Sequence, residues 1–247
     1  MIISQSGTSQ IKFGTIVYKQ ITAKEIIEKE KSSEYAAIRE VGEKIEKIIA
    51  KISYTLNFNT NEAYFFANKI LIEGDVDYFN VAACSGRGKL KCYQNNITKE
   101  FRDFNDNKRT GIVIVNNKQK YEWTLLNETK DIDNYKCYKA TTPLYYNGKK
   151  YNDVTITAWY APEIPVPFGP AGYGGLPGLI LELQNDMGTF YVKKINLALD
   201  TAPEIDKLLS PKAVSQETYM QMVMGTLSKE QLDDMREAEE EEAKKNK

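Results

Sequence analysis

Residues 161–180 read Ala161-Pro162-Glu163-Ile164-Pro165-Val166-Pro167-Phe168-Gly169-Pro170-Ala171-Gly172-Tyr173-Gly174-Gly175-Leu176-Pro177-Gly178-Leu179-Ile180. This segment holds five of the eight prolines and five of the fifteen glycines of the chain. Proline fixes φ and lacks an amide donor, so the segment cannot be an internal strand. Glycine permits positive φ and close backbone contacts. The composition therefore predicts a rigid, irregular crossover between two strands. Its apolar members are expected to plug one end of a sheet: Ile164, Val166, Phe168, Tyr173 and Leu176.

Strand patterns lie on both sides of this crossover. Residues 153–160 alternate, with Val154, Ile156, Ala158 and Tyr160 on one face and Trp159 on the opposite one. Further β-branched and aromatic segments fit strands, and short polar turns such as Asn116-Asn117 and Asn127-Glu128 separate most of them. We expect an antiparallel meander because no helix lies between them. The other predicted strands cover residues 13–21, 52–58, 62–67, 91–94, 99–104, 110–115, 121–126, 135–141, 179–184 and 189–197.

Two regions have a helical period instead. Apolar residues recur every three or four positions from about Ser33 to Ala50, which predicts one long amphipathic helix near the N-terminus. Ser215 is a candidate N-cap for a helix over 216–224, ended by Gly225, and the chain after Met235 is almost wholly charged. We therefore predict an α+β fold: a mainly antiparallel, curved, half-barrel-like sheet with the N-terminal helix. The predicted domains are a β-rich unit over 10–205 and a helical, highly charged tail over 206–247.

The composition excludes several function classes. The chain has 247 residues, a formal net charge of −1 and no histidine. The net charge does not favour nucleic-acid binding, and the lack of histidine excludes Ser-His-Asp catalysis and zinc sites that use histidine. No apolar run reaches the ~20 residues of a membrane-spanning helix. The glycines around 172–178 precede a strand and lack the Gly-Lys-Ser/Thr of a phosphate loop. We therefore predict no metal, no cofactor and no membrane span.

The cysteines leave two interpretations open. Cys84 and Cys92 flank a segment with two glycines, which could bring the two sulfurs together across a hairpin as a disulfide. Alternatively they are two unrelated thiols. Residues 1–7 lack the charged start and the apolar stretch of a signal peptide. The chain is then either cytoplasmic or the mature form of an exported protein.

A family resemblance favours export. Gly175-Leu176-Pro177-Gly178-Leu179-Ile180 is, letter for letter, the hexapeptide that names the GLPGLI family of exported bacterial proteins. The flanks resemble the family too, as do Tyr121-Glu122-Trp123 and residues 14–18, so that the resemblance covers about residues 13–200. It implies a periplasmic or cell-envelope location, with the signal peptide absent from this chain. The family has no established function, so no catalytic residue is carried over. A weaker architectural likeness connects the chain to the lipoprotein-carrier half-barrels of the periplasm.

Three function classes remain. The first is a non-catalytic binding or carrier protein of the envelope that shelters a lipid or another hydrophobic small molecule. The second is an envelope interaction or assembly protein with a filled core and a protein partner. The third and least favoured is a hydrolase that uses acidic residues such as Asp153, Glu163 and Glu182. For the first class, the candidate pocket residues are Trp159, Tyr160, Phe168, Tyr173, Leu176 and Pro177, with Gly174, Gly175 and Gly178 shaping the backbone. In the second class the same aromatic side chains only close the sheet.

Overall fold

Our computed structural model describes residues 11–21, 47, 49–69, 89–107, 110–118, 121–146, 149–186 and 188–225. Most of the strands begin or end within a few residues of the positions that the sequence predicts. The elements are β1 (Phe13–Ile21), β2 (Ser53–Asn59), β3 (Glu62–Ala67), β4 (Lys91–Asn95), β5 (Glu100–Asn107), β6 (Gly111–Lys118), β7 (Thr124–Ile132), β8 (Tyr135–Tyr146), β9 (Lys149–Ala161), the 3-10 turn η3 (Pro170–Gly172), β10 (Leu179–Asn185), β11 (Gly188–Asn196), β12 (Val214–Ser215) and α4 (Gln216–Met224).

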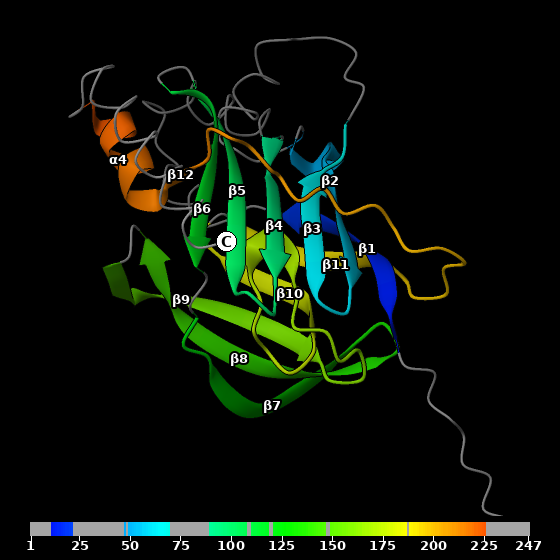
Figure 1. Ribbon diagram of the computed structural model, residues 1–247. Coiled ribbons are helices and arrows are strands. Elements are labelled where there is room, and N and C mark those ends of the chain that lie inside the picture. Colours follow the sequence, from blue (N-terminus) through cyan, green and yellow to red (C-terminus); the bar gives the residue numbers. More distant parts are fainter. Residues whose placement is uncertain are drawn as a thin grey trace, which may run out of the picture.

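All strands of the described part belong to one twelve-stranded sheet in the order β12-β6-β5-β4-β3-β2-β1-β11-β10-β9-β8-β7. Each pair is antiparallel except β12 with β6, which is parallel. The predicted meander is therefore confirmed. In Figure 1 strands β2–β6 stand upright, whereas β7–β9 cross below them almost horizontally. The two ends of the sheet thus face each other around a common interior.

The predicted α+β class is wrong, because the fold is mainly β and its dominant feature is a large open sheet. Strands β8 and β9, of 12 and 13 residues, run well beyond their predicted ends, so the sheet takes up most of the described chain. The helix predicted over about 33–50 lies mostly outside the described residues; of the described ones, residues 47 and 49–51 are helical. The 216–224 helix is confirmed as α4: Ser215 Oγ accepts from Thr218 N at 3.1 Å, and Gly225 ends the helix at φ 68°.

Two of the predicted turns are parts of strands. Asn116-Asn117 lies inside β6, where these residues pair with Arg102 and Phe101 of β5. Asn127-Glu128 forms an irregularity in β7, because the register with β8 shifts between Leu125 and Thr129. At Asn127 a β-bulge satisfies the preference of asparagine for a break in the ladder without reversing the chain, whereas Asn116-Asn117 pairs in unbroken register with β5.

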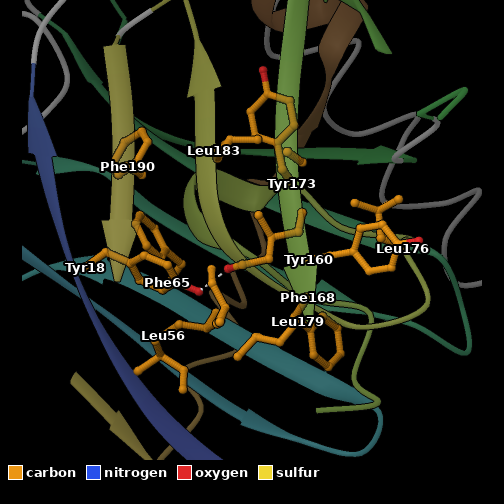
Figure 2. Packing of buried hydrophobic residues seen from close by; sticks show 14 of the residues in the cluster. Tyr18, Leu56, Phe65, Tyr160, Phe168, Tyr173, Leu176, Leu179, Leu183 and Phe190 are labelled. Carbon is orange, nitrogen blue, oxygen red and sulfur yellow. Dashed lines mark hydrogen bonds between the residues drawn. The ribbon is translucent and has the colours of Figure 1, made fainter. Parts of the chain in front are cut away.

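The main core lies between the two parts of the sheet. It joins side chains of β1–β4 and β8–β11 with those of the crossover, residues 162–178. Figure 2 shows Tyr18, Phe65 and Phe190 near Tyr160, Phe168 and Leu179. The Tyr54 ring stacks on Phe65 at a centroid distance of 5.5 Å and an interplanar angle of 7°. The crossover thus fills the interior, as the plug prediction requires.

A second irregular segment covers the opposite face of β3–β6. We call residues 197–213, between β11 and β12, the strap; it runs in front of the upper parts of these strands in Figure 1. Leu208 and Ile205 of the strap pack with Tyr64, Tyr93 and Ile114 in a separate apolar cluster. The predicted boundary between domain and tail, at 205/206, falls inside the strap. Residues 226–247 of the predicted tail lie outside the described residues.

Candidate functional site

Backbone hydrogen bonds within the crossover, and between it and the start of β10, fix its conformation. Gly175 N donates to Pro167 O at 2.9 Å, so that the segment between them doubles back on itself. Leu179 N donates to Ile164 O at 2.9 Å, and Ile180 N donates to Phe168 O at 3.0 Å. The first residues of β10 therefore pair with the crossover as well as with β9. These bonds satisfy buried amides that a proline-rich segment would otherwise leave without partners.

Side chains from distant elements hold the crossover in place. The buried hydroxyl of Tyr18 in β1 donates to Ile180 O at 2.6 Å, the interaction drawn in Figure 2. Trp123 Nε1 donates to Gly174 O at 2.8 Å, and Gln94 Nε2 of β4 donates to Gly172 O. Burial raises the pKa of Tyr18 far above its usual range, so this hydroxyl stays protonated and remains a donor. Trp123 and Gln94 thus hold the crossover itself, and Tyr18 holds the adjoining start of β10.

Gly175 and Gly178 of the hexapeptide are each required, but for different physical reasons. A Cβ on Gly178 would lie 2.3 Å from the carbonyl oxygen of Ala161, which no local adjustment of a side chain can relieve. A Cβ on Gly175 would meet nothing within 4 Å, but its φ of +86° is unfavourable for other residues. Gly174 lies against the Pro167 carbonyl. Gly178 therefore serves close packing, and Gly175 serves the backbone turn.

The structure does not bring the six predicted pocket residues together around one cavity. Tyr160, Phe168, Tyr173 and Leu176 are between 2% and 9% exposed and belong to the main core. Pro177 is exposed on the outside of the crossover. Their placement matches the filled core of the second function class more closely than a lined pocket.

Trp159 lies on the opposite face of β9 from Tyr160, as the alternation predicts. Its ring is flanked by lysines of neighbouring strands, with Lys130 Nζ 4.5 Å and Lys139 Nζ 5.9 Å from its centroid. Both lysines are ion-paired, Lys130 to Glu182 at 2.7 Å and Lys139 to Glu128 at 2.9 Å. The ring is therefore part of a charged ladder on the outer face of the sheet.

An open cleft of about 370 Å³ adjoins the crossover on the side of β4 and β5. We call it the crossover cleft. Its polar side is the end of β4, the following turn and the start of β5; its other side is the Tyr121–Glu122 segment and the crossover backbone. Of the predicted residues, it includes Phe168, Gly174 and Gly175. The lining residues are Gln94, Asn95, Asn96, Lys99, Glu100, Tyr121, Glu122, Pro167, Phe168, Gly174 and Gly175.

Hydrogen bonds fix the polar lining of the cleft. Asn95 Oδ1 accepts from Ile97 N at 2.8 Å and from Thr98 N at 3.0 Å, which shapes the turn. Asn96 Oδ1 accepts from Lys99 Nζ at 2.9 Å. Because Lys99 has a φ of 60°, its backbone adopts the left-handed conformation that closes the turn. The cleft wall is thus built by the local hydrogen bonds of this turn.

Aromatic rings support the other wall. Tyr121 is partly exposed, and its ring stacks on that of buried Tyr173 at 4.8 Å and 15°. Trp123 is tilted against Tyr121 at 5.7 Å. Residues 121–123 precede β7 and do not belong to a strand, contrary to the predicted strand over 121–126. The Tyr121 and Trp123 side chains instead contact the crossover, whereas Glu122 pairs with Lys150 of β9.

Sequence reasoning missed the polar half of this cleft. Gln94, Asn95 and Asn96 carry a turn signal between two predicted strands, which locates a hairpin but not its neighbours. Tyr121 and Glu122 are singled out only as part of the family resemblance. The pairing that brings both segments to the crossover depends on strand order, which local patterns do not specify.

A smaller open pocket of about 300 Å³ includes the predicted residue Tyr160. Lys136, Tyr138, Pro162 and Glu163 complete its lining. Glu163 Oε1 accepts from Lys136 N at 3.4 Å, while Glu182 pairs with Lys130, so these two candidate carboxylates have separate partners. Among the residues that the structure describes, no group of three His, Cys, Asp or Glu side chains could hold a metal ion.

Two thiols are shielded from water, and one carboxyl group on the inner face is partly buried. Cys92 and Cys137 are buried, and burial raises the pKa of both thiols, that of Cys137 to about 11. Cys84 lies outside the described residues, so its disulfide with Cys92 stays a prediction. Asp103 pairs with Cys92 across β4 and β5, and burial raises its pKa to about 7.

Among the described residues, no helix has both the length and the apolar character that a membrane span requires.

Comparisons with known proteins agree with this part of the sequence. A family model described as "Protein of unknown function (Porph_ging)" matches residues 146–182, a segment that contains the whole of β9, the crossover and the start of β10. The match fits the resemblance to the GLPGLI family. No curated protein has a detectably similar sequence. None of these findings supports the likeness to lipoprotein-carrier half-barrels.

Solved structures share the fold. Two structures of PNGF-II, in space groups P21 and C2, are similar with TM-scores of 0.51 and 0.52 and sequence identities of 17% and 18%. Each match covers 86% of this chain and 33% of PNGF-II. The chain therefore spans about a third of the length of PNGF-II. At this identity the similarity concerns the fold alone.

Proposed function

We propose that this protein is a non-catalytic binding protein of the bacterial cell envelope that contacts its ligand at the crossover cleft. The observation that carries the proposal is the hydrogen-bonded lining of that cleft. Asn95 and Asn96 are held by bonds within the turn, and Tyr121 is held by its stack on Tyr173. Groups fixed before binding lose little conformational freedom when a ligand arrives, so they favour binding.

The packed interior supports surface contact over the sheltering of an acyl chain. A carrier of a hydrophobic ligand needs an enclosed apolar cavity. Here the residues predicted for that task, such as Phe168 and Leu176, are each 2% exposed and contact the main core. The envelope location in the proposal rests on the family resemblance of the crossover.

The charges of the cleft support binding without catalysis. Its two carboxylates each have a basic partner: Glu100 pairs with Arg102 at 3.2 Å and Glu122 with Lys150 at 3.2 Å. A general acid or base must be free to exchange a proton with a bound ligand, whereas both of these carboxylates are engaged by basic side chains. The cleft is therefore suited to hold a ligand and not to transfer its protons.

The test is a titration of the ¹⁵N-labelled full chain, followed by NMR. The probes are a mixture of small polar fragments and, separately, palmitate. We expect saturable shifts of the Asn95, Asn96 and Gly174 amides with polar fragments, weakened several-fold in Asn96→Ala. The matched control is Asn134→Ala, an exposed asparagine in the β7–β8 turn. Saturable shifts of the core amides of Leu176 and Phe190 with palmitate, without changes in the cleft, would contradict the proposal.

A further inference from the structure

We infer that the crossover cleft binds a carboxylate with an apolar body, as found in an arylacetic acid or at the C-terminus of a peptide. In this assignment Lys99 and Asn96 hold the carboxylate, and Tyr121 faces the apolar body. The inference rests on the proposed function and specifies its ligand class. All three side chains line the cleft, the first two on its polar side and Tyr121 on the other.

The first argument is the charge of the cleft. Each of its two carboxylates, Glu100 and Glu122, is ion-paired with a basic side chain at 3.2 Å. Lys99 adds an ammonium group, whose hydrogen bond goes to the neutral carboxamide of Asn96. No carboxylate of the described residues lies within ion-pair distance of this ammonium group. The cleft therefore carries one excess positive charge, which favours a ligand with one negative charge.

The second argument is the set of donors around Lys99. Asn96 Oδ1 accepts from Lys99 Nζ at 2.9 Å, which uses one ammonium hydrogen and leaves two. The NH₂ group of Asn96 belongs to the same carboxamide, and within the described part of the chain no group accepts a hydrogen bond from it. The two donor groups are therefore neighbours. A planar carboxylate has two oxygens and can accept from both at once.

The third argument is that the turn holds these donors in place before a ligand arrives. Asn95 Oδ1 accepts from the amides of Ile97 and Thr98, which shapes the turn. Asn96 N donates to Asn61 O at 2.8 Å, so the turn is also tied to the neighbouring turn between β2 and β3. Side chains on a fixed turn lose less conformational freedom on binding, which favours affinity.

The other wall of the cleft suits an apolar body attached to the carboxylate. The Tyr121 ring is partly exposed and is supported by its stack on Tyr173 at 4.8 Å and 15°. Pro167 of the crossover lines the cleft beside it. A hydrocarbon or aryl group that covers these surfaces removes apolar area from water, which is favourable. A small inorganic anion would gain nothing from this wall.

A carboxylate also matches the charge of the site better than a phosphate group does. A phosphate group carries about −1.5 to −2 charges at pH 7 and has three strong acceptor oxygens. The cleft has one excess positive charge, and its donors belong to one ammonium group and one carboxamide. A phosphate group would therefore keep unbalanced charge and unsatisfied acceptors in this cleft.

The experiment compares two ligands that differ in charge but have nearly the same shape. The ¹⁵N-labelled full chain is titrated with phenylacetate and, separately, with phenylacetamide, and followed by NMR. We expect saturable shifts of the Lys99 and Gly174 amides and of the Asn96 side-chain NH₂. The acid should bind about tenfold more tightly than the amide, because hydrogen bonds to charged groups are stronger than neutral ones. Higher ionic strength should weaken binding of the acid only.

Two variants test the donors. Asn96→Asp is nearly isosteric and places a carboxylate against Lys99, so it neutralises the excess charge within the chain. Lys99→Gln removes the charge itself. Each should lower the affinity for phenylacetate about tenfold, to that for phenylacetamide. The matched control is Lys212→Gln, an exposed lysine of the strap, which should leave both affinities unchanged. Thermal melting checks that each variant is folded.

A third variant tests the apolar wall. Tyr121→Ala should weaken the acid and the amide by a similar factor, because both present the same phenyl group to the ring. An unchanged affinity for both ligands in this variant overturns the assignment of the apolar body. An acetylated dipeptide that ends in phenylalanine distinguishes the two sources of a carboxylate. Tighter binding of this peptide than of phenylacetate assigns a peptide C-terminus, and weaker binding assigns a small organic acid.

The remaining outcomes separate the inference from the function beneath it. Equal affinities for acid and amide, or a preference for the acid that persists in Asn96→Asp and Lys99→Gln, overturn the carboxylate and leave a binding cleft in place. Tighter binding of inorganic phosphate than of phenylacetate has the same consequence. If neither phenylacetate, phenylacetamide nor the polar fragments shift the cleft signals, both the inference and the proposed function fail.

Discussion

The crossover and the strap cover opposite faces of the same sheet by different physical means. The crossover is buried, and backbone bonds and aromatic rings hold it, including the Tyr18 hydroxyl on Ile180 O. The strap has a smaller apolar contact, around Leu208, and is also held by polar contacts at the surface: Arg102 Nη1 donates to Lys207 O at 3.1 Å, and Asn57 Nδ2 donates to Glu204 O at 2.9 Å. Buried contacts contribute more per group than exposed ones. We therefore expect the crossover to fix the fold and the strap to open more readily.

The largest effect should come from the backbone contact at Gly178. In Gly178→Ala, the new Cβ would lie 2.3 Å from Ala161 O, so β9 and β10 must separate or the crossover must shift. We expect a loss of about 3–5 kcal/mol in the free energy of unfolding, measured by urea denaturation. If Gly178→Ala fails to fold but Gly175→Ala folds, the pair still shows that close packing at Gly178 matters more than the positive φ at Gly175.

Gly175→Ala is the matched control for that contact. It is a change of the same size in the same hexapeptide, but the Cβ meets nothing within 4 Å. The positive φ alone should cost about 1–2 kcal/mol. Equal losses in the two variants would mean that backbone conformation, not close packing, makes the motif depend on glycine.

The next effect is a pH dependence of the free energy of unfolding, caused by Asp103 on the inner face of the sheet. Burial raises the pKa of Asp103 to about 7, from 3.8 in the unfolded chain. Between these values the folded state binds more protons, so stability should fall as the pH rises from about 4 to 7 and then level off. The full difference is at most about 4 kcal/mol. Asp103→Asn cannot ionise and should remove this slope in unfolding curves recorded at several pH values.

Asp106→Asn is the control for the Asp103 slope. Asp106 lies on the other face of β5, where it pairs with Lys89 at 2.6 Å. This variant should keep the fall in stability between pH 4 and pH 7. A wild-type curve that rises over this range would show that the Asp103 carboxyl is not shielded as the structure places it.

The two regions also differ in how far their sequence predicts them. Prolines and glycines restrict the backbone locally, so the crossover could be located and its apolar members assigned to the core. Its ends follow from the alternating strands on either side, Asp153–Tyr160 and Leu179–Gln184. The strap contains two prolines, Pro203 and Pro211, but no glycine, and Ile205 and Leu208 lie in a polar segment that lacks the alternation of a strand. Their burial depends on the face that β3–β6 present, which is a tertiary property.

The same distinction explains the candidate site. Alternation along β9 places Trp159 and Tyr160 on opposite faces, which the structure confirms, yet the pocket hypothesis includes both because they are aromatic neighbours of the crossover. The lysines over Trp159 come from β7 and β8, and their positions depend on strand pairing. The cleft likewise joins segments around residues 95, 121 and 174 that only the sheet order brings together. Side-chain periodicity is local, whereas a site formed by several segments is not.

The smallest effect should come from the ion pair that anchors the strap. Glu62 Oε1 lies 2.7 Å from Lys207 Nζ and accepts from the Tyr93 hydroxyl at 2.6 Å. These bonds lower the pKa of Glu62, Lys207 first among the causes. The stabilisation is therefore present above the unfolded pKa of about 4 and is lost as the pH falls below it, the opposite sign to Asp103. Glu62→Gln should cost less than about 1 kcal/mol because the pair is partly exposed.

Hydrogen exchange locates this small effect. In Glu62→Gln at neutral pH, the amides of the strap, such as Leu208, should exchange faster, whereas those of Ile180 and Leu179 in the crossover region should not change. Global unfolding would accelerate all of them together, so a difference confined to residues 204–208 identifies local opening. Acidification of the wild-type chain should reproduce the pattern, since protonated Glu62 loses its attraction to Lys207. Faster exchange at Ile180 in this variant would mean that the two covers of the sheet open as one cooperative unit, and the physical distinction between them would not hold.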